Sequence, residues 1–271
     1  FFTLIICANY QILFKKYKNF LKLCYNAFMK VLITIEYNGK YFSGWQRQKK
    51  GVGVQEVLED ALSALLKENI TLTASGRTDA GVHAICQYAH FSISSNFNLE
   101  RLPYAVNTYL PEGVRVLSAS VVDESFNARL SAHKKTYLYK IYTRKVLSPL
   151  REGYYANVPY DLNYDQMLKA AKLFLGKHNF KGFCSEGSSV KSFEREIYSF
   201  EIEKNLDEYY FKITGNGFLY NMVRRIVAAV VEVGKGKLSL KDITLALKDY
   251  NVKHITKNMP PCGLYLLNVG Y

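Results

Sequence analysis

The sequence has few cysteines and no closely spaced pair of them. It holds five cysteines in 271 residues, and no CxxC pair occurs. An odd number at such wide spacing argues against a disulfide framework and against a zinc ribbon. The pattern is typical of a reducing compartment, so we expect a cytoplasmic protein. The cysteines are Cys7, Cys24, Cys86, Cys184 and Cys262.

The N-terminal segment lacks acidic residues. Residues 1–28 contain no Asp or Glu, and their four lysines follow the apolar run Phe1–Ala8. That run is too short to span a bilayer, and a secretory signal would carry its positive charges before it. We therefore expect no membrane partner. Met29 directly precedes "KVLITIEY", which is typical of a first strand, so we expect the native chain to begin there and 1–28 to be a non-native or disordered extension.

Acidic residues are also scarce in the chain as a whole. The net charge is +13 with a pI of about 9.3, and +9 remains when the four lysines of 1–28 are set aside. Such an excess favours a polyanionic partner such as nucleic acid. Residues 129–151 hold seven Lys and Arg, no acid and the interleaved Tyr137, Tyr139 and Tyr142. This stretch is either a nucleic-acid surface or a strand with packed tyrosines and a solvated lysine edge; the overall charge favours the first.

Hydrophobic periodicity predicts strands and helices mixed in both halves of the chain. This mixture favours an α+β fold with largely antiparallel sheets. We expect an N-terminal α/β domain at 29–125 and a C-terminal α/β domain at 126–271. The predicted strands are 31–37, 70–73, 85–93, 114–122, 135–143, 196–203, 208–214 and 262–271, and the predicted helices are 54–65, 99–110, 164–175, 219–233 and 240–247.

A polar stretch, "SGRTDAGVHA" at Ser75–Ala84, lies between hydrophobic segments. Its two glycines have P-loop spacing, but Val82 and His83 stand where a P-loop needs Lys and Ser or Thr. His83 and Cys86 lack the glutamate and the later CxxC of a zinc deaminase. A turn in which Asp79 caps a helix and the glycines supply positive φ remains open on the residues alone.

The same stretch resembles the signature of the tRNA pseudouridine synthase A (TruA) family. Four further motifs occur along the chain in the family's order, and the resemblance covers about Met29 to Tyr271. Where relatives carry more arginine, "SAHKKTY" keeps the charge as lysine and histidine, which weakens bidentate phosphate pairing. The four motifs are "YNGKYFSGWQRQ", "FNARLSAHKKTYLYKI", "GNGFLYNMVRRIV" and "PPCGLYLLNVGY".

The resemblance implies a fold and an activity. Family members isomerise uridine to pseudouridine at positions 38, 39 and 40 in the tRNA anticodon stem-loop, with no cofactor and no metal. The fold would be two related α/β domains whose antiparallel sheets flank a basic cleft. The protein would be a homodimer, with tRNA contacting both subunits.

The resemblance also implies roles for residues of this chain. Asp79 would be the catalytic nucleophile, and Arg77 would help evict the target base, its alternative being a phosphate contact. Tyr137 would stack on the uracil and take the C5 proton, the alternatives being a core tyrosine or Tyr139 in its place. A cation should pair with Asp79. Helical periodicity leaves Arg224 and Arg225 equal, and the family's "MVR" pattern selects Arg224.

A rival interpretation is a non-catalytic RNA-binding protein of similar fold. Binding alone does not need the ionisable trio of Asp79, Tyr137 and Arg224. Activity that depends on this trio therefore separates the two interpretations.

Overall fold

The computed structural model describes residues 29–48, 50–94, 96–187, 190–249 and 257–271. The extension predicted for residues 1–28 lies outside these ranges. Within them, none of the helices has both the length and the apolar character needed to cross a membrane.

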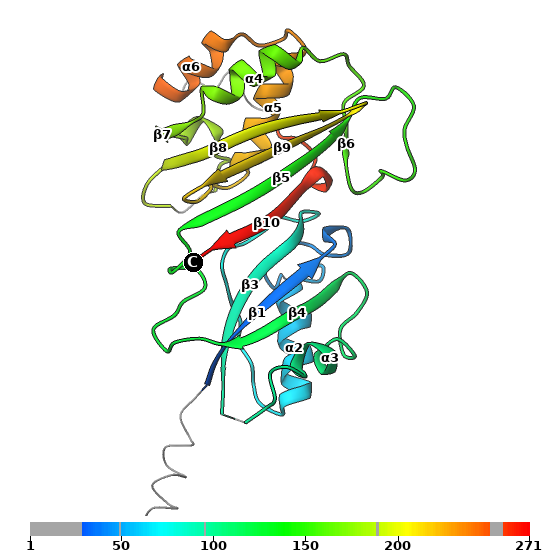
Figure 1. The fold of residues 1–271 in the computed structure, drawn as a ribbon, viewed down its shortest axis with the longest axis vertical. Coiled ribbons are helices and arrows are strands. Elements are labelled where there is room, and N and C mark those ends of the chain that lie inside the picture. Colours follow the sequence, from blue (N-terminus) through cyan, green and yellow to red (C-terminus); the bar gives the residue numbers. More distant parts are fainter. Residues whose placement is uncertain (1–28, 49, 95, 188–189, 250–256) are drawn as a thin grey trace, which may run out of the picture.

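One ten-stranded sheet runs through the described part of the molecule (Figure 1). Its main order is β4-β1-β3-β10-β5-β9-β8-β7, with β2 beside β3 and β6 beside β5. Pairing is antiparallel except between β10 and β3 and between β5 and β6, which confirms the α+β class with a mostly antiparallel sheet. The strands are β1 Met29–Tyr37, β2 Thr73–Ala74, β3 His83–Ile93, β4 Val114–Val121, β5 Lys134–Tyr142, β6 Ala156–Asn157, β7 Gly176–Asn179, β8 Glu194–Asn205, β9 Glu208–Gly215 and β10 Leu264–Gly270.

The helices gather at the two ends of the sheet (Figure 1). Two of them differ from the sequence prediction. The helix predicted for 99–110 covers only five residues, with Pro103 in its first turn. The helix predicted for 164–175 ends at Lys172, because the chain turns at Gly176, with φ +87°, into an unpredicted strand. The helices are α2 Val54–Leu66 and α3 Leu102–Val106 at the lower end, and α4 Tyr164–Lys172, α5 Met222–Gly234 and α6 Leu240–Asp249 at the upper end.

Two hydrophobic clusters form the core, one in each half of the sheet. The lower cluster includes Ile33, Leu58 and Phe91, and the upper cluster includes Phe211 and Ile226. β10, the last strand of the chain, contributes to both and pairs with β3 on one side and β5 on the other. The sheet is therefore continuous from one half to the other. The domain boundary at 125/126 stays a prediction.

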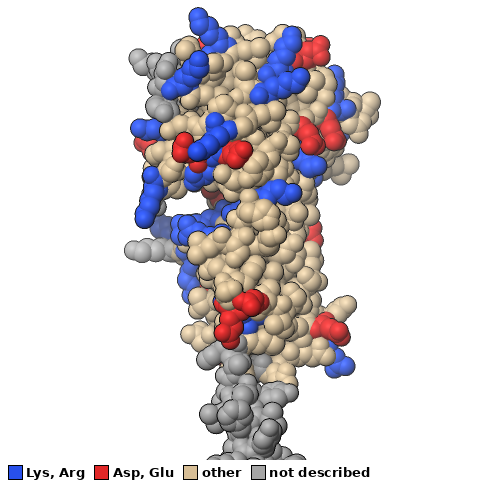
Figure 2. Space-filling view, turned by 60° about the vertical axis from the view of Figure 1, so that its left-hand side comes forward, with Lys and Arg blue, Asp and Glu red and all other residues tan. Residues whose placement is uncertain are grey.

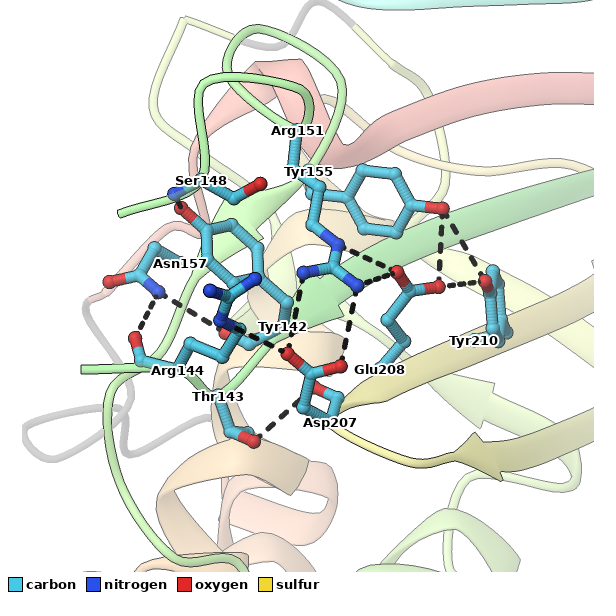
Figure 3. A network of polar contacts seen from close by, with 10 residues as sticks. All are labelled: Tyr142, Thr143, Arg144, Ser148, Arg151, Tyr155, Asn157, Asp207, Glu208 and Tyr210. Atoms are coloured by element: carbon cyan, nitrogen blue, oxygen red, sulfur yellow. Dashed lines mark hydrogen bonds and ion pairs between the residues drawn. The ribbon is translucent and has the colours of Figure 1, made fainter. Parts of the chain in front are cut away.

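A loop between β5 and β6 is fixed to the β8–β9 hairpin by a network of ion pairs (Figure 3). Arg151 donates from Nε to Glu208 Oε1 at 2.7 Å, and its Nη2 lies 3.3 Å from Asp207 Oδ1. Tyr155 and Tyr210 also donate to the Glu208 carboxylate. These contacts hold the pKa of Glu208 below its usual value, against the opposing effect of burial. The loop therefore has a fixed course over the upper half.

Candidate active site

The loop that carries Asp79 joins β2 to β3 and is held by the end of β1 and the segment after it. The backbone N–H of Trp45 donates to the Thr78 carbonyl at 3.0 Å. The buried Tyr37 hydroxyl lies 2.7 Å from Thr78 Oγ1. Because both the backbone and the side chain of Thr78 are bound, the neighbouring Asp79 has a fixed position.

Three glycines let other groups approach this loop closely. Gly44 has φ +104°, and a Cβ there would lie 2.9 Å from the Thr78 carbonyl oxygen. Gly81 has φ +78°, as expected for a glycine that supports a tight turn. Gly76 has no positive φ; a Cβ there would lie 2.8 Å from the Nζ of Lys135. Gly76 therefore makes room for a neighbouring ammonium group.

Lys135 on β5 reaches the start of the loop. Its Nζ donates to the Ser75 carbonyl at 2.7 Å. Gln87 also binds the start of the loop: its side chain accepts a hydrogen bond from Ser75 Oγ at 2.5 Å and donates one to the Gly76 carbonyl at 2.9 Å. Burial lowers the pKa of Lys135 to about 8, with further lowering by nearby cations. The sequence identified this lysine as one basic residue among several, but nothing in it predicted the contact with the loop.

Asp79 and Arg224 meet across the two halves of the molecule. Arg224 Nη1 lies 3.4 Å from Asp79 Oδ2, and the two side chains are 14% and 30% exposed. Arg224 also donates from Nε to the Met259 carbonyl and from Nη1 to Asn221 Oδ1, both at 2.7 Å. Burial raises the pKa of the Asp79 carboxyl, and the Arg224 guanidinium partly opposes that rise. Asp79 is therefore a partly exposed carboxylate, and its partner cation, Arg224, is held in place by two further hydrogen bonds.

The neighbouring arginine has other partners. Arg225 donates from Nε to Asn258 Oδ1 at 3.2 Å and from Nη1 to the Cys184 carbonyl at 3.1 Å. Of the two arginines that periodicity could not separate, Arg224 is thus the one that contacts Asp79. The turn itself is closed by the Val82 N–H, which donates to the Asp79 carbonyl at 3.1 Å.

Tyr137 lies where the two hydrophobic clusters meet and packs against both. Its ring is edge-on to Phe218, with centroids 5.2 Å apart and planes at 84°. Burial raises the pKa of its phenol strongly, and the fields of Tyr37 and Asp79 raise that pKa further. Tyr139, the alternative from the sequence, is fully buried and donates its hydroxyl to the Pro260 carbonyl at 2.5 Å. Of the two tyrosines, Tyr137 is the less buried, and it is the one whose pKa the Asp79 charge raises.

Arg77 is exposed. Within the described residues its side chain has no ion pair and no hydrogen bond. Asp79 and Arg224 are in contact, and Tyr137 lies within electrostatic reach of Asp79.

His83 follows the loop and is 2% exposed. Its Nδ1 accepts from the Gly39 N–H at 3.1 Å, so its Nε2 carries the hydrogen and faces the carbonyls of Gly153 and Cys262. Tyr265 stacks on the ring at a centroid distance of 4.5 Å. Burial lowers the pKa of His83. Both ring nitrogens are occupied, and the described residues hold no group of three His, Cys, Asp or Glu suited to a metal ion.

Comparisons with known proteins identify the family. A family model described as tRNA pseudouridine synthase matches residues 33–130 and 170–271, more than half of the chain. The chain belongs to the tRNA pseudouridine synthase family. Asp79 and Arg224 lie within the two matched segments, and Tyr137 lies between them.

Curated relatives from the family match almost their whole length. The tRNA pseudouridine synthase A of Thermoanaerobacter sp. (strain X514) is 42% identical over 241 residues, which are 89% of this chain and 99% of that protein. The enzyme of the same name from Staphylococcus aureus (strain MRSA252) is 40% identical over 238 residues, 88% and 90% of the two chains. The chain is therefore an isomerase, a tRNA pseudouridine synthase, and its family implies a tRNA substrate.

A solved structure gives a weaker match. A chain in a crystal structure of a Cbf5-Nop10-Gar1 complex has a TM-score of 0.38 and 14% identity, over 88% of this chain and 49% of that one. A TM-score at this level carries no conclusion about function.

Proposed function

We propose that Asp79 is the catalytic nucleophile that acts on the target nucleotide of tRNA. In the reaction, the bond between N1 of uracil and C1′ breaks, the base turns, and C5 bonds to C1′. The proton leaves C5 and N1 gains one, so no atom is lost or added. A carboxylate that is 30% exposed, in a loop bound on two sides, supports this role.

Arg224 is proposed to orient and charge-stabilise that carboxylate. The planar Arg224 guanidinium donates hydrogen bonds to three acceptors: the Asp79 carboxylate, the Asn221 side chain and the Met259 carbonyl. Burial raises the Asp79 pKa and the Arg224 guanidinium opposes that rise, so the pairing with Arg224 favours the ionised form of the carboxyl. An ionised carboxylate is what either a covalent adduct at C1′ or abstraction of a sugar proton requires.

Tyr137 is proposed to stack on the detached uracil. Its ring is already fixed by Phe218, and stacking on a fixed ring costs little conformational freedom. Because burial raises its pKa strongly, the phenol is neutral at neutral pH. A neutral phenol favours stacking on the base over acceptance of the C5 proton.

Arg77 is proposed to take the place of the evicted base. It is exposed and stands two residues before Asp79. Turning a nucleotide out of a helix costs a few kcal/mol, and a stacked guanidinium offsets part of that cost.

The resemblance supports finer proposals about substrate and assembly. The targets are uridines at positions 38, 39 and 40 of the anticodon stem-loop, the enzyme works as a homodimer with tRNA on both subunits, and it works in the cytoplasm. Residues 29–125 and 126–271 form its two domains. The excess of Lys and Arg over acidic residues suits a polyanionic substrate.

Tritium release from C5-labelled tRNA tests the chemistry, because the hydrogen on C5 leaves during isomerisation. The protein should release tritium, and Asp79→Asn should not. Asp161→Asn, which changes an exposed aspartate outside the helices and strands, should behave like the unchanged protein. Robust release by Asp79→Asn would remove the assigned nucleophile. Tight tRNA binding with no release by the unchanged protein would favour a non-catalytic RNA-binding protein.

A further inference from the structure

Three cations, of which Lys135 contacts the Asp79 loop, have no acidic partner among the residues that the structure describes. They are Lys135 on β5, Arg195 at the start of β8, and Arg129 in the segment before β5. Beside burial, the charges of Arg129 and Arg195 lower the Lys135 pKa, so each of these two arginines lies within electrostatic reach of Lys135. Within the described residues, none of the three forms an ion pair with Asp or Glu. Such a cluster repels itself unless an anion joins it.

Lys135 and Arg195 are connected through the paired strands β5, β9 and β8. The residue opposite Lys135 on β9 is Gly215, and the residue opposite Gly215 on β8 is Ile197, two positions after Arg195. A Cβ on Gly217 would lie 3.8 Å from Arg195 Nε. A Cβ on Gly215 would lie 3.3 Å from Cζ of Phe218, so the ring that packs on Tyr137 lies over Gly215, between Lys135 and Arg195.

The cations keep hydrogen-bond donors for a ligand. The Lys135 ammonium has three N–H groups and uses one on the Ser75 carbonyl. Arg195 donates to the carbonyls of Ser192 and Glu194 from Nη1 alone. The Arg129 side chain is exposed and makes no hydrogen bond to another described residue. An anion with several oxygens fits this set of donors.

The cluster also lies at a definite place relative to the chemistry. Lys135 contacts the loop at Ser75 and Gly76, three to four positions before Asp79. Gly215 ends β9, and the segment after it runs through Gly217 to Phe218, which packs on Tyr137. Figure 2 shows Lys and Arg side chains gathered around a hollow at mid-height, the level at which β10 joins the two halves in Figure 1.

We propose that Lys135, Arg195 and Arg129 bind one backbone phosphate of the tRNA strand that carries the target uridine. The inference rests on the proposed function. The bound phosphate fixes the strand beside the Asp79 loop, and Lys135 links its position to that loop through Ser75. A purely structural Lys135 would hold the loop and leave RNA binding unchanged, which is the alternative that the experiment must separate.

Binding of an anticodon stem-loop RNA hairpin as a function of salt gives the first test. Lys135→Met should weaken binding roughly tenfold. It should also lower the slope of log K against log salt, by at most about 0.7 to 0.9, which is the contribution of one phosphate contact. Arg195→Gln and Arg129→Gln should lower the slope in the same direction, with the three losses together amounting to one phosphate contact, and Lys135→Arg should restore the slope. Lys248→Met is the matched control: this exposed lysine lies on α6, at the upper end of the molecule, and should change neither quantity.

Neutral phosphate replacement gives the second test. A set of hairpins carries one uncharged methylphosphonate each, at successive linkages around the target uridine. The unchanged protein should lose affinity at one linkage, and Lys135→Met should lose no further affinity at that linkage, since the contact is already absent. Equal penalties in both proteins at every linkage, with an unchanged salt slope, would overturn the proposal and leave Lys135 as a loop support.

Both tests measure binding, so they are independent of the assignment of Asp79. If Lys135→Met fails to fold, Arg195→Gln and Arg129→Gln decide the outcome by the same two measurements. If the unchanged protein binds the hairpin with no release of tritium, the proposed catalytic function fails while the phosphate site can still be confirmed.

Discussion

Replacement of Arg224 should slow the reaction and move its acid limit. Arg224→Gln removes the cation 3.4 Å from the Asp79 carboxylate and leaves the burial of that carboxylate in place. A hydrogen bond to a charged group contributes about 1.5 to 3 kcal/mol. The distance exceeds the 2.7 to 2.9 Å of a short charge-assisted bond, so the lower value applies, and kcat/KM should fall roughly tenfold.

The pH profile separates this role from general damage. Arg224 lowers the Asp79 pKa against the effect of burial, so its loss raises that pKa. The ionised form then disappears at a higher pH, and the acid limb of kcat/KM should move upward in Arg224→Gln. Arg225→Gln is the control, because it changes the same residue type on the same helix but contacts Asn258 and Cys184. An unmoved acid limb, or an equal loss in the control, would refute the assignment.

Three further outcomes follow from the geometry. Gly44→Ala should cost about 1 to 3 kcal/mol of unfolding free energy, since its Cβ would meet the Thr78 carbonyl at φ +104°, and Gly236→Ala, with φ +70° and open space, should cost less in the same urea titration. The pKa of Lys135 is about 8 in the folded protein and 10.5 in the unfolded chain, so the unfolded chain binds more protons between these values. The free energy of unfolding, relative to that of Lys135→Met, should therefore rise by about 2 kcal/mol from pH 7 to pH 9.5. An equal difference between the two proteins at both pH values would show that burial does not lower the Lys135 pKa. Tyr137→Phe keeps the aromatic ring and should leave KM unchanged, while Tyr137→Leu removes the ring and should raise KM roughly tenfold. If Tyr137→Phe were as inactive as Asp79→Asn, the hydroxyl would have a chemical role.

Local patterns predicted most strands and helices, because each reflects the environment of consecutive residues. The stripe of α2 and the alternation of β1 and β5 are of this kind. Pairing between distant segments has no such local signal. Nothing in "CGLYLLNVGY" shows that β10 lies parallel to β3, and the four residues of β7 are too few for a period.

The candidate site shows the same division. Asp79, Tyr137 and Arg224 were found through motifs that the family shares, and periodicity left Arg224 and Arg225 equal. The choice depends on the segment before β10, where Met259 accepts from Arg224 and Asn258 accepts from Arg225. The support from Lys135 depends on a carbonyl 60 residues away in sequence. Contacts of this range become visible only once the sheet is assembled.

β10 gives this arrangement its physical basis. Asp79 belongs to the lower half and Arg224 to the upper half, so their 3.4 Å contact depends on the relative position of the two halves. The segment that enters β10 accepts the Arg224 Nε–H at Met259 and the Tyr139 hydroxyl at Pro260. The strand then pairs with β3, which begins just after the Asp79 loop. The segment that enters β10 thus holds Arg224, and β10 itself positions β3, the strand that follows Asp79. A substitution that weakens the pairing of β10 should therefore separate Asp79 from Arg224 before it unfolds either hydrophobic cluster.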